Sequence, residues 1–292
     1  MSGVTLLLLF SLLSQPVKMP VAPAQPEPDT FDLAGRTVVL SADDGYRSIY
    51  ENAYPLLKRY HMTMTLALIG NYLTKGRIAY RPGDRFINRA EVQEMIDSCG
   101  AEVASHGLSH AYLTRIDSAR VWREAYGSKH LLESLFNREV ITFVYPYGRT
   151  NPRVRRTIAR AGYLVARAVR PGNPDLGADP YRIPEVELRD TTSLVRVQHH
   201  IRHHRVTVLM LHSIVPQPQR FTEWSTGDFA ALLGWLHRRN AKVVTLGGLY
   251  RTWWRQKVTK ELLQVIEEAS DRRQDLLFKQ VDVDATGTLH PR

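Results

Sequence analysis

Apolar runs and amphipathic stretches alternate along most of this chain. Short runs rich in β-branched and other apolar residues, bounded by turn residues, predict strands. Stretches with apolar positions three or four residues apart predict helices between most of these strands. The predicted strands are residues 37–42, 64–70, 101–105, 140–145, 162–169, 205–213 and 241–246. The predicted helices are residues 48–60, 89–99, 117–136, 151–161, 192–204 and 226–239.

This alternation favours an α/β fold with a parallel sheet, because parallel neighbours need a crossover connection and a helix usually supplies it. Seven strands over residues 37–246 suit a closed barrel better than an open sheet. A chain of 292 residues with 43% hydrophobic content can bury one large core of this kind. We therefore expect a distorted (β/α)7 barrel related to the TIM barrel, with its functional side chains at the C-terminal ends of the strands.

The two ends of the chain differ in composition from the middle. Val4–Leu13 is an apolar run of ten residues, shorter than the ~20 that a membrane-spanning helix needs, and it fits the apolar region of a secretory signal. Ala22–Ala24 matches an A-x-A cleavage pattern, but no basic residue precedes the run, so an uncleaved anchor or a misplaced start codon stays open. We expect a signal peptide or N-terminal anchor at 1–24, a linker at 25–35, the barrel domain at 36–255, and a C-terminal helix and tail at 256–292. The protein is accordingly expected to be exported, and to be secreted, periplasmic or associated with the cell surface.

Charge narrows the classes of partner. The chain has 39 Lys and Arg against 29 Asp and Glu, a formal net charge of +10. This balance favours anionic surroundings, and association with an anionic membrane or cell surface stays open. The basic residues are spread over many helices without interleaved aromatic residues, so no nucleic acid is expected as a partner. Cys99 is the only cysteine, so no intramolecular disulfide can form, and we expect a monomer.

Residues of the types that bind metals or move protons follow several predicted strands. The C-terminal ends of parallel strands meet at one face of a barrel, so these side chains are expected to lie together. A lone histidine is more often a core residue than a ligand, and an H-x-x-x-H pair alone is a weak signal, but the shared position makes the combination specific. The residues are Asp43 and Asp44 after the first strand, His106 and His110 after the third, Tyr145 to Gly148 after the fourth, and His212 after the sixth.

The spacing of these residues indicates a metal centre. Two imidazoles four residues apart and one carboxylate can hold a divalent cation and leave positions open, which suits Zn²⁺ and also Fe²⁺, Co²⁺ or Ni²⁺. Adjacent aspartates cannot easily both bind one ion, so either Asp43 or Asp44 is left beside it as a general base. His212, from another strand, is placed to protonate a leaving group. The set is typical of metal-assisted hydrolysis of an acyl bond.

The ordered motifs resemble those of the polysaccharide deacetylases, which form carbohydrate esterase family 4 and share the NodB homology domain. The resemblance spans residues 36–250, and the ordered set carries it rather than any single motif. The similar motifs are ADDG at 42–45 beside the family's Thr-Phe-Asp-Asp-Gly, HGLSH at 106–110 beside His-x-x-x-His, YPYG at 145–148, and LMLH at 209–212 beside Leu-x-x-His.

The resemblance implies a role for each matched residue. Asp43 would be the general base and His212 the acid that protonates the departing amine. The ligands of one divalent ion, with Zn²⁺ ahead of Co²⁺, Ni²⁺ or Fe²⁺, would be Asp44, His106 and His110.

Further residues are weighed as substrate contacts. The resemblance implies that the backbone N–H of Tyr147 helps to hold the oxyanion, and Pro146 and Arg149 flank it. Trp224 is expected either to stack on a sugar ring or to close the end of the barrel. The four histidines of 198–204 are interpreted as a solvated basic helix face rather than as a second metal site.

The chain departs from the family pattern at two points. Val144 stands where the third motif usually has an arginine that orients the base, and the Asp-rich fourth motif is not visible. Residues 179–188 occupy its place, and Arg182 or Glu185 is the expected replacement partner of the base.

These departures, with PYG in the third motif, look most like the branch that deacetylates poly-β-1,6-N-acetylglucosamine. The resemblance thus implies a metal-dependent N-deacetylase of an exported amino-sugar polysaccharide. The alternatives are a peptidoglycan or chitin-oligomer deacetylase, an acetyl xylan esterase, a catalytically silent carbohydrate-binding barrel, and an amidohydrolase of small cyclic amides.

Overall fold

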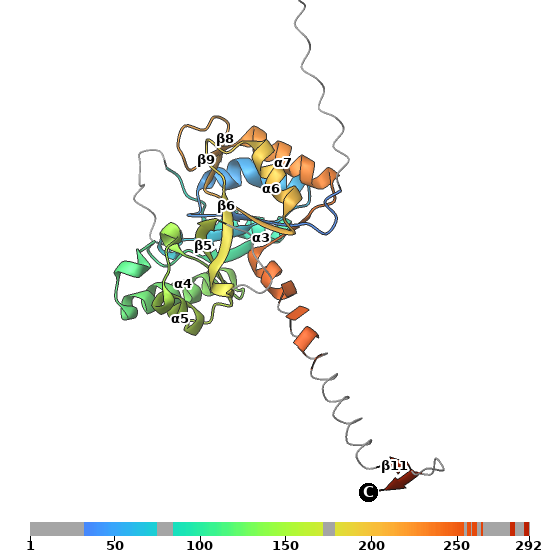
Figure 1. Ribbon diagram of the computed structural model, residues 1–292. Coiled ribbons are helices and arrows are strands. Elements are labelled where there is room, and N and C mark those ends of the chain that lie inside the picture. The colour runs from blue at the N-terminus through green and yellow to red at the C-terminus, as the bar shows by residue number, and fades with distance from the viewer. Residues whose placement is uncertain are drawn as a thin grey trace, which may run out of the picture. The chain divides into compact units, whose positions relative to one another are not determined.

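Seven parallel strands close into a barrel (Figure 1), as the sequence pattern predicts. The computed structural model describes residues 32–74, 84–171 and 179–253, and short pieces between residues 256 and 291. Neighbouring strands pair in chain order, and β1 pairs with β7 along its whole length, which closes the ring. The strands of the ring are β1 (Thr37–Ala42), β2 (Thr65–Leu68), β3 (Glu102–Ser105), β4 (Thr142–Val144), β5 (Val165–Pro171), β6 (Ile183–Glu187) and β7 (Val206–Leu211).

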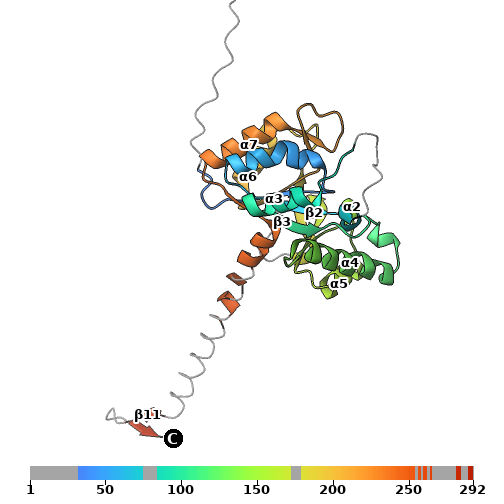
Figure 2. The same cartoon turned by 180° about the vertical axis from the view of Figure 1, so that it is seen from behind.

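Helices on the outside of the barrel connect its strands (Figures 1 and 2). Local chemistry sets their ends: Asn88 and Glu91 form a capping box at the start of α3, and Gly100 ends that helix in the left-handed conformation. All six predicted helices are confirmed, with ends that differ by at most two residues. The helices are the π-helical turn η1 (Ile49–Ala53) continued by α1 (Tyr54–Arg59), α2 (Gly70–Thr74), α3 (Arg89–Cys99), α4 (Ser118–Phe136), α5 (Pro152–Arg160), α6 (Leu194–His203) and α7 (Thr226–Arg238).

The set of strands differs from the prediction in more than one place. Ile183–Glu187 forms β6, which the pattern does not predict because a proline and two glutamates interrupt its apolar positions. The strand predicted at 241–246 exists as β10 (Lys242–Val244), but it pairs with the amino-terminal half of β1 and lies outside the ring. The carboxyl-terminal half of the same β1 edge pairs with β2. This divided edge distorts the barrel.

The amino end of the barrel is closed by a segment that follows β10. Leu246 packs there in a buried apolar cluster with side chains from β1, β5, β6 and β7. Beside it, the Glu102 carboxylate accepts hydrogen bonds from the hydroxyls of Thr65 (2.8 Å) and Thr142 (2.5 Å) and from the Gly247 N–H (3.0 Å). Apolar and hydrogen-bonded groups therefore fill this end, and the carboxyl end is left for the site.

Both predicted terminal segments lie largely beyond the described residues. The predicted signal or anchor at 1–24 is not described, nor is most of the linker at 25–35. The predicted tail at 256–292 is described in short pieces, which include an antiparallel pair of β11 (Val281–Val283) and β12 (Leu289–Pro291). Among the described residues, no helix combines the length and apolar composition that crossing a membrane requires.

Candidate active site

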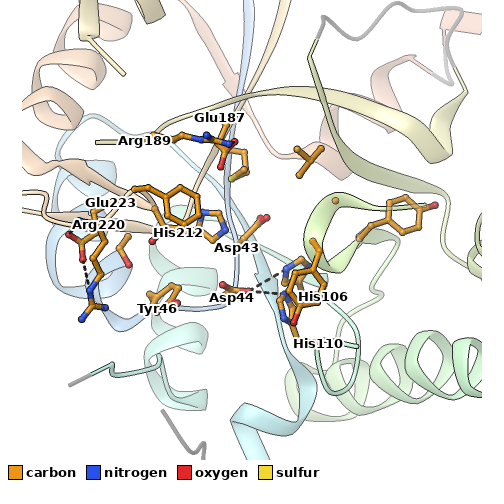
Figure 3. Close-up of a pocket in the computed structure, with 18 of the residues that line it drawn as sticks. Asp43, Asp44, Tyr46, His106, His110, Glu187, Arg189, His212, Arg220 and Glu223 are labelled. Atoms are coloured by element: carbon orange, nitrogen blue, oxygen red, sulfur yellow. Dashed lines mark hydrogen bonds and ion pairs between the residues drawn. The ribbon is translucent and has the colours of Figure 1, made fainter. Parts of the chain in front are cut away.

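The residues predicted from the strand ends lie around one cavity at the carboxyl end of the barrel (Figure 3). The cavity has a volume of about 670 Å³. Asp43 and Asp44 directly follow β1, His106 directly follows β3 and His212 directly follows β7, while His110 lies on the loop after β3. The topology of the barrel thus brings five residues from three distant parts of the sequence to one place.

Asp44, His106 and His110 form a group that can hold a metal ion. The Nε2 atoms of His106 and His110 lie 3.4 and 3.3 Å from Oδ1 of Asp44. This Oδ1 atom is buried without a hydrogen-bond partner, an unfavourable state that a bound cation would relieve. Two imidazoles and a carboxylate fit Zn²⁺, and also Fe²⁺, Co²⁺ or Ni²⁺. Within the described ranges, no other three side chains bring potential ligand atoms this close together.

His106 is held in the tautomer that a metal ligand needs. Its Nδ1 atom lies 2.8 Å from the backbone carbonyl oxygen of Val144. Because a carbonyl can only accept, Nδ1 carries a proton, and Nε2, on the Asp44 side, is the nitrogen left to bind a cation. The end of β4 therefore fixes the orientation of a ligand that follows β3.

Neighbouring charges set the protonation of the three candidate ligands. Burial alone would raise the pKa of Asp44, but the contact with His106 and the charges of the surrounding imidazoles lower it well below its ordinary value. Burial, followed by the charge of His106, lowers the pKa of His110 to about 4. Burial opposes ionisation of His106 as well, yet the Asp44 contact and the charge of Asp43 raise its pKa. At neutral pH, a cation therefore competes with a proton at His106 rather than at His110.

A tight turn after β1 sends the two aspartates in different directions. Asp44 (φ 67°) and Gly45 (φ 76°) both adopt the left-handed conformation, which is uncommon for a residue other than glycine. The turn is fixed by the Asp43 N–H, which bonds to β7 at 2.9 Å, and by the Gly45 N–H, which bonds to the Asp43 carbonyl at 2.8 Å. Asp44 consequently points toward the two histidines, and Asp43 points away from them (Figure 3).

Asp43 forms a buried ion pair with Arg167, which the sequence analysis did not single out. Arg167 Nη2 donates to both carboxylate oxygens of Asp43, and Nη1 pairs with Glu185. Arg167 is 1% exposed, and both carboxylates are 4% exposed. Arg182 is exposed in the one-turn helix η4 (Pro180–Arg182), so its assignment as the group that orients the base is wrong. Glu185 does take part, but as the counter-ion of the arginine.

Arg167 reaches the base from the strand next to the one that the family pattern uses. Val144 on β4 and Arg167 on β5 are register partners. Val144 packs inside the barrel with Ala67 and Ala104, where small side chains leave room. The guanidinium from β5 can therefore stand where an arginine from β4 was expected. The sequence feature that could have indicated this partner of the base is Arg167 itself, a single arginine within the apolar run at 162–169.

The turn after β4 braces one wall of the cavity. This turn is the one-turn helix η3 (Pro146–Gly148), in which Tyr147 has a left-handed φ of 58°. The Tyr147 ring stacks on Tyr112, with centroids 3.6 Å apart, and contacts the ring of His110 at 4.5 Å. A glycine is required at 148, because a Cβ atom there would lie 2.0 Å from the side chain of Val169. The turn therefore supports a candidate metal ligand.

The predicted substrate contacts fall into three groups. Tyr147 and Arg149 line the cavity. Pro146 is buried at the start of η3, and its contact with substrate stays a prediction. Trp224 is 1% exposed, and its indole N–H donates to a backbone carbonyl before α6 at 2.8 Å, so it packs in the core and the prediction that it stacks on a sugar is wrong. Phe221, three residues earlier, is 54% exposed and lines the cavity.

The loop that carries Phe221 is held rigidly at the rim of the cavity. The loop joins β8 (Ser213–Val215) to β9 (Glu223–Ser225). The Glu223 carboxylate accepts the Arg220 N–H at 3.0 Å, and the Arg220 guanidinium pairs with Asp84 at 2.7 Å. The Arg189 guanidinium lies over the Phe221 ring, 5.5 Å from its centroid. Phe221 was not predicted from the sequence, because the substrate contact was assigned to Trp224, a larger aromatic residue three positions later.

Histidines elsewhere around the site differ in their surroundings. His212 lines the cavity, and no described group hydrogen-bonds its buried Nδ1. On α6, His199 stacks on His203 and His200 stacks on His204, each pair with centroids 4.1 Å apart. Among the residues that the structure describes, no third potential ligand joins either pair, and the interpretation of 198–204 as a basic helix face stays a prediction.

Comparison with known proteins agrees with this geometry. The family model described as polysaccharide deacetylase matches residues 32–166. The Bacillus subtilis protein YxkH is 26% identical over 153 residues, which are 52% of each chain. The poly-beta-1,6-N-acetyl-D-glucosamine N-deacetylase of Staphylococcus aureus is 29% identical over 168 residues, which are 53% of this chain and 55% of that one. The chain thus spans about half the length of these curated relatives.

Solved structures share the fold. The peptidoglycan deacetylase PdaC of Bacillus subtilis superposes with a TM-score of 0.54 at 16% identity, over 78% of this chain and 96% of that one. The Streptococcus pyogenes deacetylase PplD superposes with a TM-score of 0.51 at 22% identity, over 56% of this chain and 69% of that one. The match over residues 32–166 and the ordered motifs at the strand ends show that this part of the chain is similar to the polysaccharide deacetylase family.

Proposed function

We propose that this protein is a metal-dependent N-deacetylase that removes acetyl groups from an exported N-acetylglucosamine polymer, specifically the β-1,6-linked polymer. The observation that carries the proposal is the pair of adjacent aspartates with separate partners. Asp44 lies beside two imidazoles, and Asp43 lies beside the Arg167 guanidinium. The match of residues 32–166 to the polysaccharide deacetylase family supports deacetylation, and similarity to a Staphylococcus aureus protein named for the β-1,6 polymer supports the linkage.

Asp44, His106 and His110 would hold one divalent cation, with Zn²⁺ ahead of Co²⁺, Ni²⁺ or Fe²⁺. When bound there, the cation supplies a Lewis acid that polarises the acetyl carbonyl and acidifies water. The Val144 carbonyl fixes the Nδ1–H of His106 and so leaves its Nε2 for the cation, and the lowered pKa of His110 keeps that ring neutral at neutral pH. Tyr147 holds the ring of His110 in place by stacking contact.

Asp43 is assigned as the general base that takes a proton from the attacking water. Its two carboxylate oxygens receive hydrogen bonds from one guanidinium nitrogen of Arg167, so its orientation is fixed. Glu185 holds the other side of the guanidinium and prevents it from turning away. Positioning within hydrogen-bond reach of the water is the first requirement of such a base.

His212 and the η3 turn complete the reaction. His212 donates a proton to the amine nitrogen as the bond between that nitrogen and the acetyl carbon breaks and acetate forms. The resemblance to the family implies that the Tyr147 N–H stabilises the oxyanion of the tetrahedral intermediate. Such a donor is typically worth about 2.7–4 kcal/mol of barrier.

The shape of the surface around the site supports a polymeric substrate. A cavity of about 460 Å³ adjoins the central one and shares Val169 and Arg189 with it. Another of about 320 Å³ also adjoins it and shares Asp84 and Arg220. A central cavity that is continued by two further cavities suits a sugar chain better than a small cyclic amide. Exposed Phe221, beside Arg189, offers a ring face on which a sugar can stack.

Two alternatives are set against this proposal. The same chemistry acts equally on peptidoglycan, on chitin oligomers or on acetylated xylan, and acetate release from each of these, compared with release from the β-1,6 oligomers, separates them. A silent carbohydrate-binding barrel is the other alternative: one structural neighbour with a TM-score of 0.54 is a pseudoenzyme of carbohydrate esterase family 4 from Bacillus anthracis, so the fold alone does not imply turnover. Retention of Asp43 with its arginine, beside the three potential ligands, favours turnover in this chain.

We further propose that the protein is exported through residues 1–24 and acts as a monomer. The apolar run Val4–Leu13 and the A-x-A pattern support export. Cell fractionation and sedimentation of the purified protein test these two points.

The function is tested with the full chain, loaded with Zn²⁺ and incubated with acetylated β-1,6- and β-1,4-linked glucosamine oligomers. Release of acetate with matching free amine from the β-1,6 oligomers, and slower release from the β-1,4 oligomers, is expected. Asp43→Asn should abolish release and retain bound zinc, whereas His106→Ala should lose both. Equal rates on both linkages would overturn the linkage, and absence of release from all acetylated polymers would overturn the reaction.

A further inference from the structure

Basic residues gather on the end of the barrel opposite the active site. The backbone there forms three hydrogen bonds that bring four of them together. The segment before β1 donates to the carbonyl of Arg239 at 2.8 Å, the first residue of β1 donates to that of Arg205 at 2.8 Å, and Lys242 donates to that of Arg36 at 3.0 Å. All four lie where β1, β7 and β10 begin, so they surround the amino end of the barrel.

Two helices add charge to this end. α6 and α7 contact each other and lie side by side in both views (Figures 1 and 2), and each ends just before a strand that starts here. Residues 194–205 contain three arginines and four histidines without an aspartate or glutamate. Residues 236–242 contain three lysines or arginines and likewise no acidic residue. The acidic residue Asp32 also precedes β1, and its carboxylate accepts the Ala34 N–H at 3.0 Å.

We name this surface the amino-end basic face and define it by Arg36, Arg205, Arg238, Arg239 and Lys242. Arg205, Arg238 and Lys242 are exposed. Five lysine and arginine side chains on one face produce a local positive potential, which the total charge of +10 alone does not reveal. The surface around the active site differs, since Glu187, Glu223 and Asp84 pair with the arginines there.

We propose that the amino-end basic face docks on an anionic phospholipid membrane. Each lysine or arginine that reaches an anionic bilayer strengthens binding roughly fivefold. The sequence before Asp32 also includes the apolar run Val4–Leu13. Stable membrane attachment generally takes two signals, such as one apolar segment and one polybasic patch, and this sequence has an apolar run in addition to the basic face.

Docking in this orientation has a functional consequence. The strands run from the amino-end basic face to the cavity, so a bilayer against the face leaves the cavity open on the side away from the membrane. A polymer leaving the cell can then enter the cavity without passing between protein and lipid. The inference concerns binding, and it holds or fails independently of the proposed reaction.

The test compares the full chain with two triple variants in vesicle sedimentation. The vesicles are pure phosphatidylcholine or phosphatidylcholine mixed with phosphatidylglycerol, and the measured quantity is the ratio of the two partition coefficients, which cancels the contribution of the apolar segment. The face variant is Arg205→Gln, Arg238→Gln and Lys242→Gln. The control variant, Arg120→Gln, Arg123→Gln and Arg156→Gln, removes the same charge from exposed positions on α4 and α5. Thermal unfolding confirms that both variants are folded.

Wild type and control variant should favour the anionic vesicles, and added salt should weaken that preference. The face variant should lose about 100-fold of it, from roughly fivefold for each of three cations. Equal loss in both variants, or a larger loss in the control, overturns the proposal, because the contact is then diffuse or lies on the α4 and α5 side. The proposal is also overturned if the face variant binds vesicles as wild type does but no longer binds soluble polyglutamate. The partner of the face would then be an acidic polymer.

Discussion

Replacement of Arg167 by methionine tests the central feature of the site, in which one guanidinium serves two buried carboxylates. Methionine fills a similar apolar volume but removes the charge and all donors. Asp43 and Glu185, each 4% exposed, are then left without their shared cation. Breaking a buried ion pair in this way costs about 3–5 kcal/mol, out of roughly 5–15 kcal/mol that hold a typical domain. At about 2–4 °C per kcal/mol, the unfolding temperature should fall by roughly 6–20 °C.

Activity should fall beyond what lost stability explains. Acetate release is measured at a temperature at which the Arg167→Met variant is folded, and kcat should be about 100-fold lower or more, the usual contribution of a positioned general base. Bound zinc should stay at the wild-type level, because Arg167 contacts none of the three potential ligands. Arg167→Lys restores the charge but not the planar two-sided contact, so stability should recover more than kcat does.

A double variant tests how much of the lost stability comes from the uncompensated charge of Glu185. Adding Glu185→Gln to Arg167→Met removes one uncompensated carboxylate, so the double variant should unfold at a higher temperature than the single one. The matched control is Arg182→Gln, which removes an exposed arginine nearby and should change neither stability nor kcat. Wild-type unfolding and wild-type kcat in Arg167→Met, with loss of activity in Arg182→Gln, would refute the assignment.

Three further predictions follow from the geometry of the same cavity. Zinc affinity, measured with a competing chelator, should fall about tenfold per pH unit once the pH is below the raised pKa of His106. The fall should become steeper only near pH 4, where His110 also takes up a proton, and an affinity that does not change with pH would contradict this prediction. Phe221→Ala should raise KM for long oligomers about tenfold at nearly constant kcat, whereas Phe221→Trp should leave KM unchanged. An equal increase of KM for the monosaccharide would exclude stacking on the oligomer. Gly148→Ala should lower the free energy of unfolding by about 2 kcal/mol or more, because the added Cβ would overlap a side chain of β5. Gly100 has a similar φ of 64° but open space around it, so Gly100→Ala should cost only about 1 kcal/mol. Equal losses of unfolding free energy in chemical denaturation would contradict the predicted overlap at Gly148.

The candidate metal ligands could be predicted because their positions depend on chain order alone. In a parallel barrel, every strand end points to the same face, so Asp44, His106 and His110 are brought together once the strands are identified. The partner of the base could not be predicted in this way. Arg167 lies within a strand rather than after it, and whether its side chain faces the interior depends on the register of β5 against β4. A contact that depends on register needs three-dimensional information.

Misassigned elements have a similar origin. The pattern of β6 is polar because Glu185 faces Arg167 inside the barrel, so the feature that completes the site is the one that hides the strand. The large aromatic Trp224 was weighed for sugar contact from its place in the sequence, but a hydrogen bond to a backbone carbonyl before α6 holds it in the core. Burial of an aromatic residue on a loop is decided by its neighbours, which are remote in sequence.

The two adjacent aspartates can be assigned by their electrostatic partners. Asp43 already has a cation, since Arg167 lies against both of its oxygens, and a second cation at that position would be repelled by the guanidinium. Asp44 faces two imidazoles whose Nε2 atoms lie 3.3 and 3.4 Å away, and its Oδ1 atom has no hydrogen-bond partner. A divalent ion is therefore favoured beside Asp44 and disfavoured beside Asp43. The alternatives that spacing leaves open are resolved by the fixed charge on β5: the arginine that orients the base also determines which aspartate is left to bind the metal.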